Sequence, residues 1–477
     1  MAAPRKQALD QLDNTLEKIV HTPGARLSSL VLTLVVDGQT VHEFGSGRSF
    51  IAPQADVADT PVLVEAPALA DKPARPDTLY RIASISKPVT TMAALSLWEE
   101  GRLDLDRDVS DYLGWPLRNP AYPDQAISCA MLISHLSSLR DGEVYNMPLG
   151  AQLRDFFEPG GRGWEDGAHF ADPARSKAAA AGAAEALPGT VKSGSLPDLA
   201  PGKFFAYCNL GYGVVATVIE RITGERYDRY VKRRILDPLG MEASFNVNLL
   251  SDSAFSRLAP IYRTGREGSY DPAGSWQAQV DDYRGRRPAL PCPALEGKTA
   301  ADLEAYVPGT NGTLFSPQGG LRASVRDLSR LLRLFTGTSG SGKDRDRGSL
   351  DGVRVLKEES LALMMKSRWH FDPVHPNGDC YNGMTRECGL GLMHTTDTRD
   401  HFGGDRLLAE GGPCLWGHHA DAYGLLGGMM FHPEEAYGFA YLIGGTAEDP
   451  EKLRGRHSSY FIWEEGIQAA ALGCLKA

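Results

Sequence analysis

The chain has 477 residues, of which 42% are hydrophobic and 23% are charged, a composition typical of a globular protein with one or two domains. Its formal net charge of -10 argues against nucleic acid or an anionic membrane as the main partner, because both bind basic surfaces. No apolar run approaches the roughly 20 residues of a transmembrane helix. Because the N-terminal segment shows no signal peptide, we expect a cytoplasmic protein. A secreted protein whose signal peptide has already been removed is the alternative.

The first predicted elements are an amphipathic helix and a β-hairpin. Five apolar residues near the N-terminus share one helical face: Leu9, Leu12, Leu16, Ile19 and Val20. Residues 30–36 and 39–44 are two strand-like runs joined by Asp37-Gly38, a typical two-residue hairpin turn. The next segment, 50–76, is rich in Ala, Pro and Asp and predicts a surface loop.

Helical patterns dominate from residue 84 to about residue 250. One helix is predicted over 88–101, another over 214–222 with Gly224 as its C-cap, and a third over 227–236. Within this half, residues 155–202 are rich in Gly, Ala and Pro and predict a long loop insertion that could border a site.

Strand-like segments return at 423–431 and 437–443, and a final helix is predicted over 458–472. Strands at both ends and helices between them predict an α+β fold, in which an antiparallel sheet built from both termini is flanked by helices and carries an inserted, mainly helical domain. We place the sheet domain at 1–83 and 310–477 and the helical domain at 84–309. A site in such a fold is expected in the cleft between the two parts.

The seven cysteines are scattered and form no C-x-x-C pair, which favours free thiols; a Cys380–Cys388 disulfide is the alternative. No zinc motif is present, and we expect neither a metal nor an organic cofactor. Residues 336–344 resemble a phosphate-binding loop, but Asp344 replaces the hydroxyl residue and a helix precedes the loop where a strand is required. We interpret this segment as a linker.

Ser84-Ile85-Ser86-Lys87 is the S-x-x-K sequence of the chain, and it lies at the start of a predicted helix. Residues three apart lie on one helical face, so the Ser84 hydroxyl and the Lys87 amine are expected to meet there. A neutral lysine can take the hydroxyl proton, and N–H groups at a helix start stabilise an oxyanion. The alternative is an N-cap serine beside a surface lysine.

Two further segments carry residues suited to this chemistry. Tyr207 and Asn209 precede a strong helix; a tyrosine beside an ammonium can have a lowered pKa and act as base or acid. The alternative for this pair is a buried ring and a helix cap. Residues 414–424 include His418 and His419 beside the C-terminal strands, where an edge strand could offer an oxyanion-binding N–H.

Ser84-x-x-Lys87, Tyr207-x-Asn209 and the strand carrying His418 resemble the three active-site motifs of the serine β-lactamase and penicillin-binding-protein superfamily. The resemblance is greatest to class C β-lactamases, family VIII carboxylesterases and D-aminopeptidases. Segments 131–139, 236–241 and 319–324 also match, in the family order, and the similarity covers about residues 8–470. The resemblance implies a β-lactamase/transpeptidase-like fold and a structural role for His135.

The third motif departs from the K-T-G that is usual in class C β-lactamases. In one register, His418-His419-Ala420 takes the place of K-T-G, and the second oxyanion-binding N–H belongs to Asp421. In the other register, Trp416-Gly417-His418 takes that place, and the second oxyanion-binding N–H lies closer to the histidines in the sequence. Loss of the motif lysine removes a cation suited to a β-lactam carboxylate. The departure therefore favours esters or amides without that anion.

The resemblance implies a serine hydrolase that forms an acyl-enzyme on Ser84. Lys87 and Tyr207 would transfer protons, with the identity of the base left open because the two groups would titrate as a coupled pair. Asn209, Trp416 and His418 would bind substrate, and the N–H groups of Ser84 and Asp421 would bind the oxyanion.

The expected substrate is a small-molecule ester, which makes a carboxylesterase the first hypothesis. D-aminopeptidase or amidase activity, weak β-lactamase activity, acyl transfer and a non-catalytic binder are the alternatives. The sequence indicates no oligomeric state.

Overall fold

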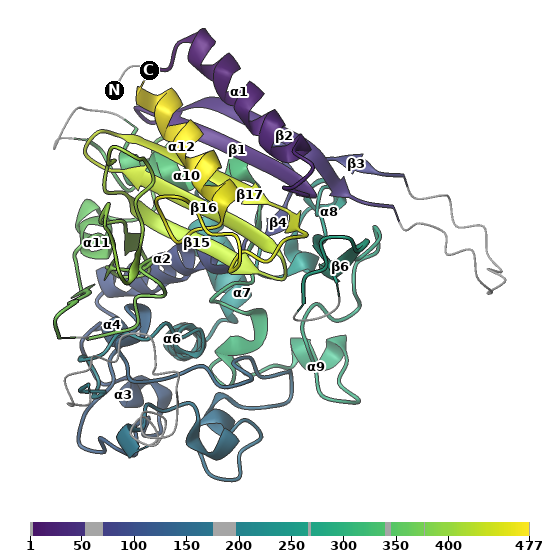
Figure 1. The fold of residues 1–477 in the computed structure, drawn as a ribbon. Coiled ribbons are helices and arrows are strands. Elements are labelled where there is room, and N and C mark those ends of the chain that lie inside the picture. The colour runs from purple at the N-terminus through teal and green to yellow at the C-terminus, as the bar shows by residue number, and fades with distance from the viewer. Residues whose placement is uncertain are drawn as a thin grey trace, which may run out of the picture.

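A nine-stranded antiparallel sheet forms the centre of the molecule (Figure 1). The computed structural model describes residues 3–52, 70–174, 197–265, 269–338, 345–375 and 377–476. The strand order is β10-β11-β12-β15-β16-β17-β1-β2-β3, so strands from the two ends of the chain meet where β17 pairs with β1. The strands are β1 (Ser29–Val36), β2 (Gln39–Phe50), β3 (Lys72–Pro73), β10 (Trp369–His370), β11 (Glu387–Cys388), β12 (Met393–His394), β15 (Trp416–Ala422), β16 (Leu425–His432) and β17 (Tyr437–Ile443).

Helices cover both faces of this sheet. α1 (Lys6–His21) and α12 (Ile462–Lys476) lie side by side on one face, and α10 (Val325–Thr336) packs against β1 and β17. β1 is buried along its whole length because alternate residues enter two separate cores. Leu30, Leu32 and Leu34 pack in the core with α1 and α12, whereas Val31 and Val35 pack in the core that contains α10.

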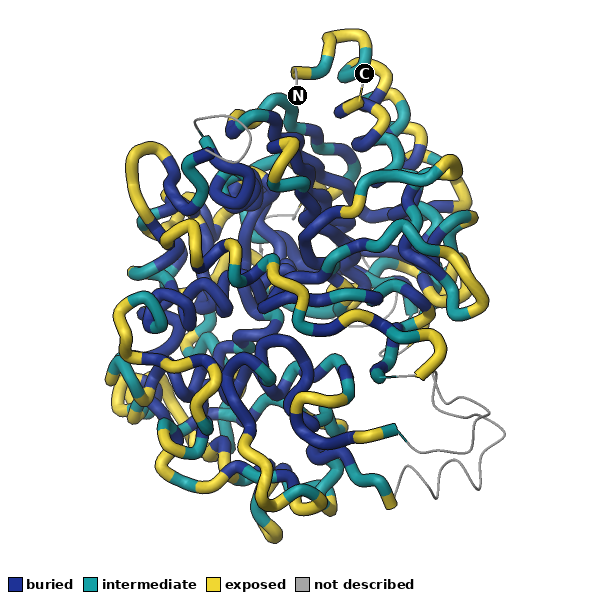
Figure 2. Tube along the Cα trace, turned by 90° about the vertical axis from the view of Figure 1, so that its left-hand side faces the viewer, coloured by how far each residue is buried: buried dark blue, intermediate teal, exposed yellow. Residues whose placement is uncertain are grey.

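The segment between the sheet strands is mainly helical and lies beneath the sheet in Figure 1. Its α-helices are α2 (Ser86–Glu99), α3 (Val109–Leu113), α4 (Cys129–Ile133), α6 (Leu210–Thr223), α7 (Tyr227–Val231), α8 (Asp252–Ser256) and α9 (Ala300–Glu304), followed near the sheet by α11 (Glu358–Met364). Buried residues run continuously from the sheet into these helices, and exposed residues are concentrated on the outer loops (Figure 2).

Short strands form four smaller sheets. β4 (Tyr80–Arg81) pairs with β7 (Arg322–Ala323), which joins the segment before Ser84 to the segment after Gln318. β5 (Ile261–Thr264) lies between β6 (Trp276–Val280) and β18 (Gly445–Thr446) and pairs with β18 in parallel. The other two pairs are β8 (Ser349–Leu350) with β9 (Val353–Arg354) and β13 (Arg399–Asp400) with β14 (Gly403–Gly404). Only β4 lies in a segment that looks extended from the sequence, residues 78–83, and the other short strands were not predicted.

The predicted α+β architecture is confirmed, with its antiparallel sheet built from both termini. The hairpin forms as expected, with Asp37 and Gly38 at φ 47° and 71°. The predicted insertion at 155–202 differs in part, because Phe156, His169 and Phe170 are buried. Its residues 175–196, and 53–69 of the predicted surface loop, lie outside the described residues. The domain boundaries stay a prediction.

All seven cysteines are free thiols, including Cys380 and Cys388. In the described ranges, the structure contains no helix that is both long and apolar enough to cross a membrane.

Candidate active site

Ser84 lies at a sharp turn between β4 and α2. The short 3-10 turn η1 (Ala83–Ile85) leads directly into α2, and Ala83 has the left-handed backbone angle φ 45°. An alanine in this conformation is strained, so the surrounding packing must hold it. Ser84 is partly exposed, whereas Ala83, Ile85, Ser86 and Lys87 are buried. The turn therefore leaves Ser84 partly exposed at the start of a helix that is otherwise buried.

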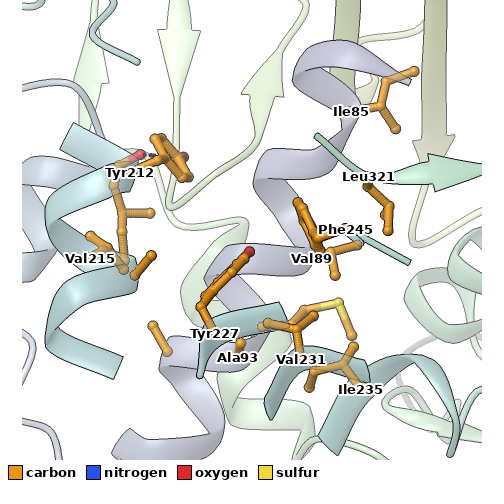
Figure 3. Packing of buried hydrophobic residues seen from close by; sticks show 14 of the residues in the cluster. Ile85, Val89, Ala93, Tyr212, Val215, Tyr227, Val231, Ile235, Phe245 and Leu321 are labelled. Carbon is orange, nitrogen blue, oxygen red and sulfur yellow. Dashed lines mark hydrogen bonds between the residues drawn. The ribbon is translucent and has the colours of Figure 1, made fainter. Parts of the chain in front are cut away.

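α2 is a rigid base for this turn. Every residue from Ser86 to Leu97 is buried. Figure 3 shows Val89 and Ala93 on this helix, and Ile85 just before it, within the apolar cluster that also contains Tyr227 and Phe245. The polar side chains on α2 are satisfied internally: Thr90 pairs with the Tyr227 hydroxyl at 2.6 Å.

Lys87 lies fully buried beside Ser84. Its Nζ is 3.0 Å from Ser84 Oγ, 2.9 Å from Asn209 Oδ1 and 3.0 Å from the Gln318 carbonyl oxygen. The pKa of Lys87 is lowered to about 7, mainly because the amine is buried. The negative charge of Asp141 raises this pKa, but its effect is smaller than that of burial. Near neutral pH, a large fraction of Lys87 is therefore the free amine, which can accept the Ser84 proton. This contradicts the alternative of a surface lysine.

Tyr207 covers the other side of Lys87. The Lys87 Nζ is 4.6 Å from the centroid of the Tyr207 ring, and the Tyr207 hydroxyl interacts with Ser84. Burial raises the pKa of Tyr207 well above its usual value, and the hydrogen bond with Ser84 offsets this only in part. The predicted lowering of its pKa is wrong, because desolvation dominates. Tyr207 is a neutral phenol.

His135 supports Tyr207 from behind. Its ring stacks on the Tyr207 ring with 4.3 Å between centroids, and its Nδ1 accepts a hydrogen bond from the Cys208 N–H. Burial holds the pKa of His135 well below 6.5. These contacts give His135 the structural position that the resemblance implied.

Asp141 is the residue of this cluster that the sequence did not reveal. Its carboxylate accepts hydrogen bonds from the backbone N–H groups of Asn209 and Leu210, at the start of α6, and from Asn209 Nδ2 at 2.8 Å. Because Nδ2 faces Asp141, the Asn209 Oδ1 faces Lys87. Asn209 therefore positions the lysine and has both ends of its amide occupied. The sequence feature that could have indicated Asp141 is its position, two residues after segment 131–139, which matches the family.

His418 on β15 reaches the same cluster. Its ring lies 6.1 Å from the Tyr207 ring, centroid to centroid, and only 3% of the residue is exposed. His419 points to the opposite face of the sheet, where it lies 4.4 Å from the Tyr460 ring. Trp416 shares the His418 face but stacks on His394 at 4.3 Å, in the neighbouring strand β12. The structure thus brings together Ser84, Lys87, Tyr207, Asn209 and His418.

The edge of β15 beside η1 exposes backbone groups from residue 418 onward. β12 pairs only with Trp416 and Gly417, and the Thr395 N–H donates to the Leu415 carbonyl. N–H groups alternate between the two edges of an antiparallel strand, so the N–H groups of His419 and Asp421 face this free edge. β15 also contacts η1, the turn that carries Ser84.

A sequence model of the Beta-lactamase family matches residues 12–458. The chain belongs to this family.

Several curated proteins of this kind are similar to the chain. The mouse mitochondrial serine beta-lactamase-like protein LACTB is 27% identical over 48% of this chain and 45% of its own length. Esterase EstB of Burkholderia gladioli is 29% identical over 36% of this chain and 39% of its own length. Penicillin-binding protein 4 of Amycolatopsis lactamdurans is 25% identical over 72% of this chain and 65% of its own length. The chain thus spans less than half of the mouse relative.

Solved structures share the fold over nearly the whole chain. The D-amino acid amidase of Ochrobactrum anthropi SV3 has a TM-score of 0.58 at 17% identity and covers 99% of both chains. The octameric penicillin-binding protein homologue of Pyrococcus abyssi has a TM-score of 0.53 at 22% identity, with 93% of this chain and 74% of that chain covered. At these identities the likeness shows the fold alone.

Proposed function

We propose that this beta-lactamase-family protein is a serine hydrolase with carboxylesterase activity on small esters. The observation that carries the proposal is the contact between Ser84 and Lys87: a buried amine, with a pKa near 7, lies 3.0 Å from a partly exposed hydroxyl. A nucleophile within hydrogen-bond distance of a base that is neutral at working pH is the arrangement that covalent catalysis requires.

In the proposed acylation step, Lys87 Nζ takes the Ser84 proton while Oγ attacks the ester carbonyl. The negative charge on the carbonyl oxygen is accepted by the N–H groups of Ser84 and of a β15 residue, for which we assign Asp421. The tetrahedral intermediate expels the alkoxide, Tyr207 donates its proton to that oxygen, and Lys87 returns a proton to Tyr207. Water then hydrolyses the acyl-enzyme by the same groups.

The register with His418 as the third-motif residue supports this assignment. The His418 side chain lies beside Tyr207, and the Asp421 N–H three residues later faces the free edge of β15. Trp416 stacks on His394, which favours this register over the one centred on Trp416. Trp416 stays a proposed part of the substrate-binding wall.

Esters are favoured over β-lactams because the site presents no cation from its third motif. Burial and the nearby Lys87 lower the pKa of His418 to about 3, so the ring is neutral over the physiological range. A neutral imidazole gives no charge to attract the carboxylate of a β-lactam. The name of the relative Esterase EstB agrees with this preference.

The proposal is tested by comparing kcat/KM for p-nitrophenyl butyrate and a chromogenic cephalosporin, together with fluorophosphonate labelling of Ser84. We expect labelling, a burst of p-nitrophenol and at least about a tenfold preference for the ester. A tenfold preference for the cephalosporin would replace esterase by β-lactamase activity. No labelling and no burst would favour a non-catalytic binder.

A further inference from the structure

The His418 ring has a fixed tautomer. Its Nδ1 lies 2.7 Å from the carbonyl oxygen of His419. A carbonyl oxygen only accepts hydrogen bonds, so Nδ1 must carry the ring proton. In a neutral imidazole the other nitrogen then has a free lone pair. His418 therefore presents Nε2 as a hydrogen-bond acceptor.

Nε2 of His418 is buried and has no hydrogen-bond partner. The groups that face this ring are Lys87, Tyr207 and His135 on the helical side, with His419 next to it on the strand. The Lys87 Nζ is already within 3.0 Å of three other oxygen atoms. A buried acceptor without a donor costs free energy, and a ligand that supplies a donor recovers that cost.

We propose that His418 Nε2 is a specificity site for a hydroxyl or N–H donor on the leaving group of the substrate. This inference rests on the proposed ester hydrolysis at Ser84. The leaving-group side follows from Tyr207, which would protonate the departing oxygen and lies next to His418. A carboxylate at the same position would place negative charge against a lone pair. The site therefore selects hydroxyalkyl or amino-bearing leaving groups and rejects acidic ones.

Three butyrate esters test this specificity: 2-hydroxyethyl, 2-methoxyethyl and carboxymethyl butyrate. All three give the same acyl-enzyme, so differences in kcat/KM arise in acylation. We expect the hydroxyethyl ester to exceed the methoxyethyl ester by about 5-fold or more, the ratio that one hydrogen bond to a buried group supports, and the carboxymethyl ester to be slowest.

Variants at two neighbouring histidines distinguish the effect of the His418 Nε2 acceptor on specificity from the general effect of replacing a histidine on β15. His418→Phe is expected to bring the hydroxyethyl to methoxyethyl ratio near 1, and His418→Lys to make the carboxymethyl ester the best of the three. His419→Phe, on the opposite face of the strand, should keep the wild-type ratio. A wild-type ratio near 1, or a ratio unchanged in His418→Phe, would overturn the proposal.

A measurement that needs no turnover tests the tautomer directly. In the full chain labelled with ¹⁵N-histidine, His418 is assigned by its absence in His418→Gln, and we expect the neutral Nδ1-protonated form from pH 5 to 8. A protonated Nε2 would overturn the acceptor even if p-nitrophenyl butyrate is hydrolysed. Failure of that ester to react would instead count against the proposed function.

Discussion

Lys87 combines complete burial with three oxygen atoms within 3.0 Å of a single nitrogen. Asp141, whose charge raises the pKa of Lys87, binds Asn209 and the start of α6 and makes no ion pair with the lysine. Desolvation therefore determines the protonation of Lys87. The sequence predicted that Ser84 and Lys87 meet, but burial decides the pKa, and a tetrapeptide does not reveal burial.

The pH dependence of kcat/KM should report this amine. A base with a pKa lowered to about 7 is protonated and inactive below that pH and free above it. We therefore expect kcat/KM for p-nitrophenyl butyrate to rise tenfold per pH unit below about 7 and to level off above it. A profile that rises only near the ordinary lysine pKa of 10.5 would show that Lys87 is not the base.

Asp141, as a positioning residue, should also affect the pH dependence of kcat/KM. The Asp141→Asn variant removes a charge that raises the pKa of Lys87 and weakens the hold on the Asn209 amide. We expect kcat/KM to fall by about 10- to 100-fold, and the acid limb to move to lower pH. Asp124→Asn, at an exposed aspartate, is the matched control. A fall in rate without any shift of the acid limb would indicate a purely structural role.

At the scale of elements, η1 and β15 provide the two sides of the proposed oxyanion site. The sequence predicted α2 and the C-terminal strands from their periodicity and glycines, because those patterns are local. It could not predict the left-handed Ala83, since that conformation depends on packing from distant segments. Gly319 is one such neighbour, because its position lies directly against the Ala83 backbone.

The strain at Ala83 can be measured with paired glycine variants. Ala83→Gly replaces a left-handed alanine by the residue that tolerates φ 45°, so the free energy of unfolding should change by less than about 0.5 kcal/mol. Ala93→Gly, in the middle of α2, should lose about 1–2 kcal/mol. Chemical denaturation checks both. Equal losses at the two positions would show that the turn stores no strain.

The backbone N–H of Asp421 can be tested without changing the rest of β15. Asp421→Ala keeps the N–H and should retain most of kcat. Asp421→Pro removes it at a free strand edge, where proline is tolerated, and should lower kcat by about 10²- to 10³-fold. Circular dichroism checks that both variants fold. Equal kcat values for the two variants would move the second oxyanion donor away from Asp421.

At the scale of the molecule, the sheet explains how motifs more than 300 residues apart meet at one site. β17 pairs with β1, which fixes β15 next to η1, and the helical segment brings Tyr207 and Asn209 to the other side of Lys87. Strand-like segments at both ends of the sequence were sufficient to predict a sheet built from both termini, but not its short strands β3, β10, β11 and β12. The contact between Asp141 and Asn209 was not predictable, because neither segment alone shows its partner.

Some structural features outside the motifs could not be predicted from the amino-acid composition either. The glycine- and proline-rich start of the predicted insertion buries Phe156 and His169, with the His169 Nε2 2.8 Å from the Gly163 carbonyl oxygen. The parallel pairing of β18 with β5 joins segments about 180 residues apart. Two-residue strands have no periodicity to detect, so such links come only from the folded structure.

The most direct test of the acyl-enzyme is mass spectrometry of the full chain quenched during turnover of p-nitrophenyl butyrate. We predict a butyryl group on the peptide that contains Ser84. The modification should be absent in Ser84→Ala and should accumulate at least about 100-fold more slowly in Lys87→Met, which removes the base. Butyryl on another residue, or an equal rate of modification in Lys87→Met, would contradict the assignment of Ser84 as nucleophile and Lys87 as its base.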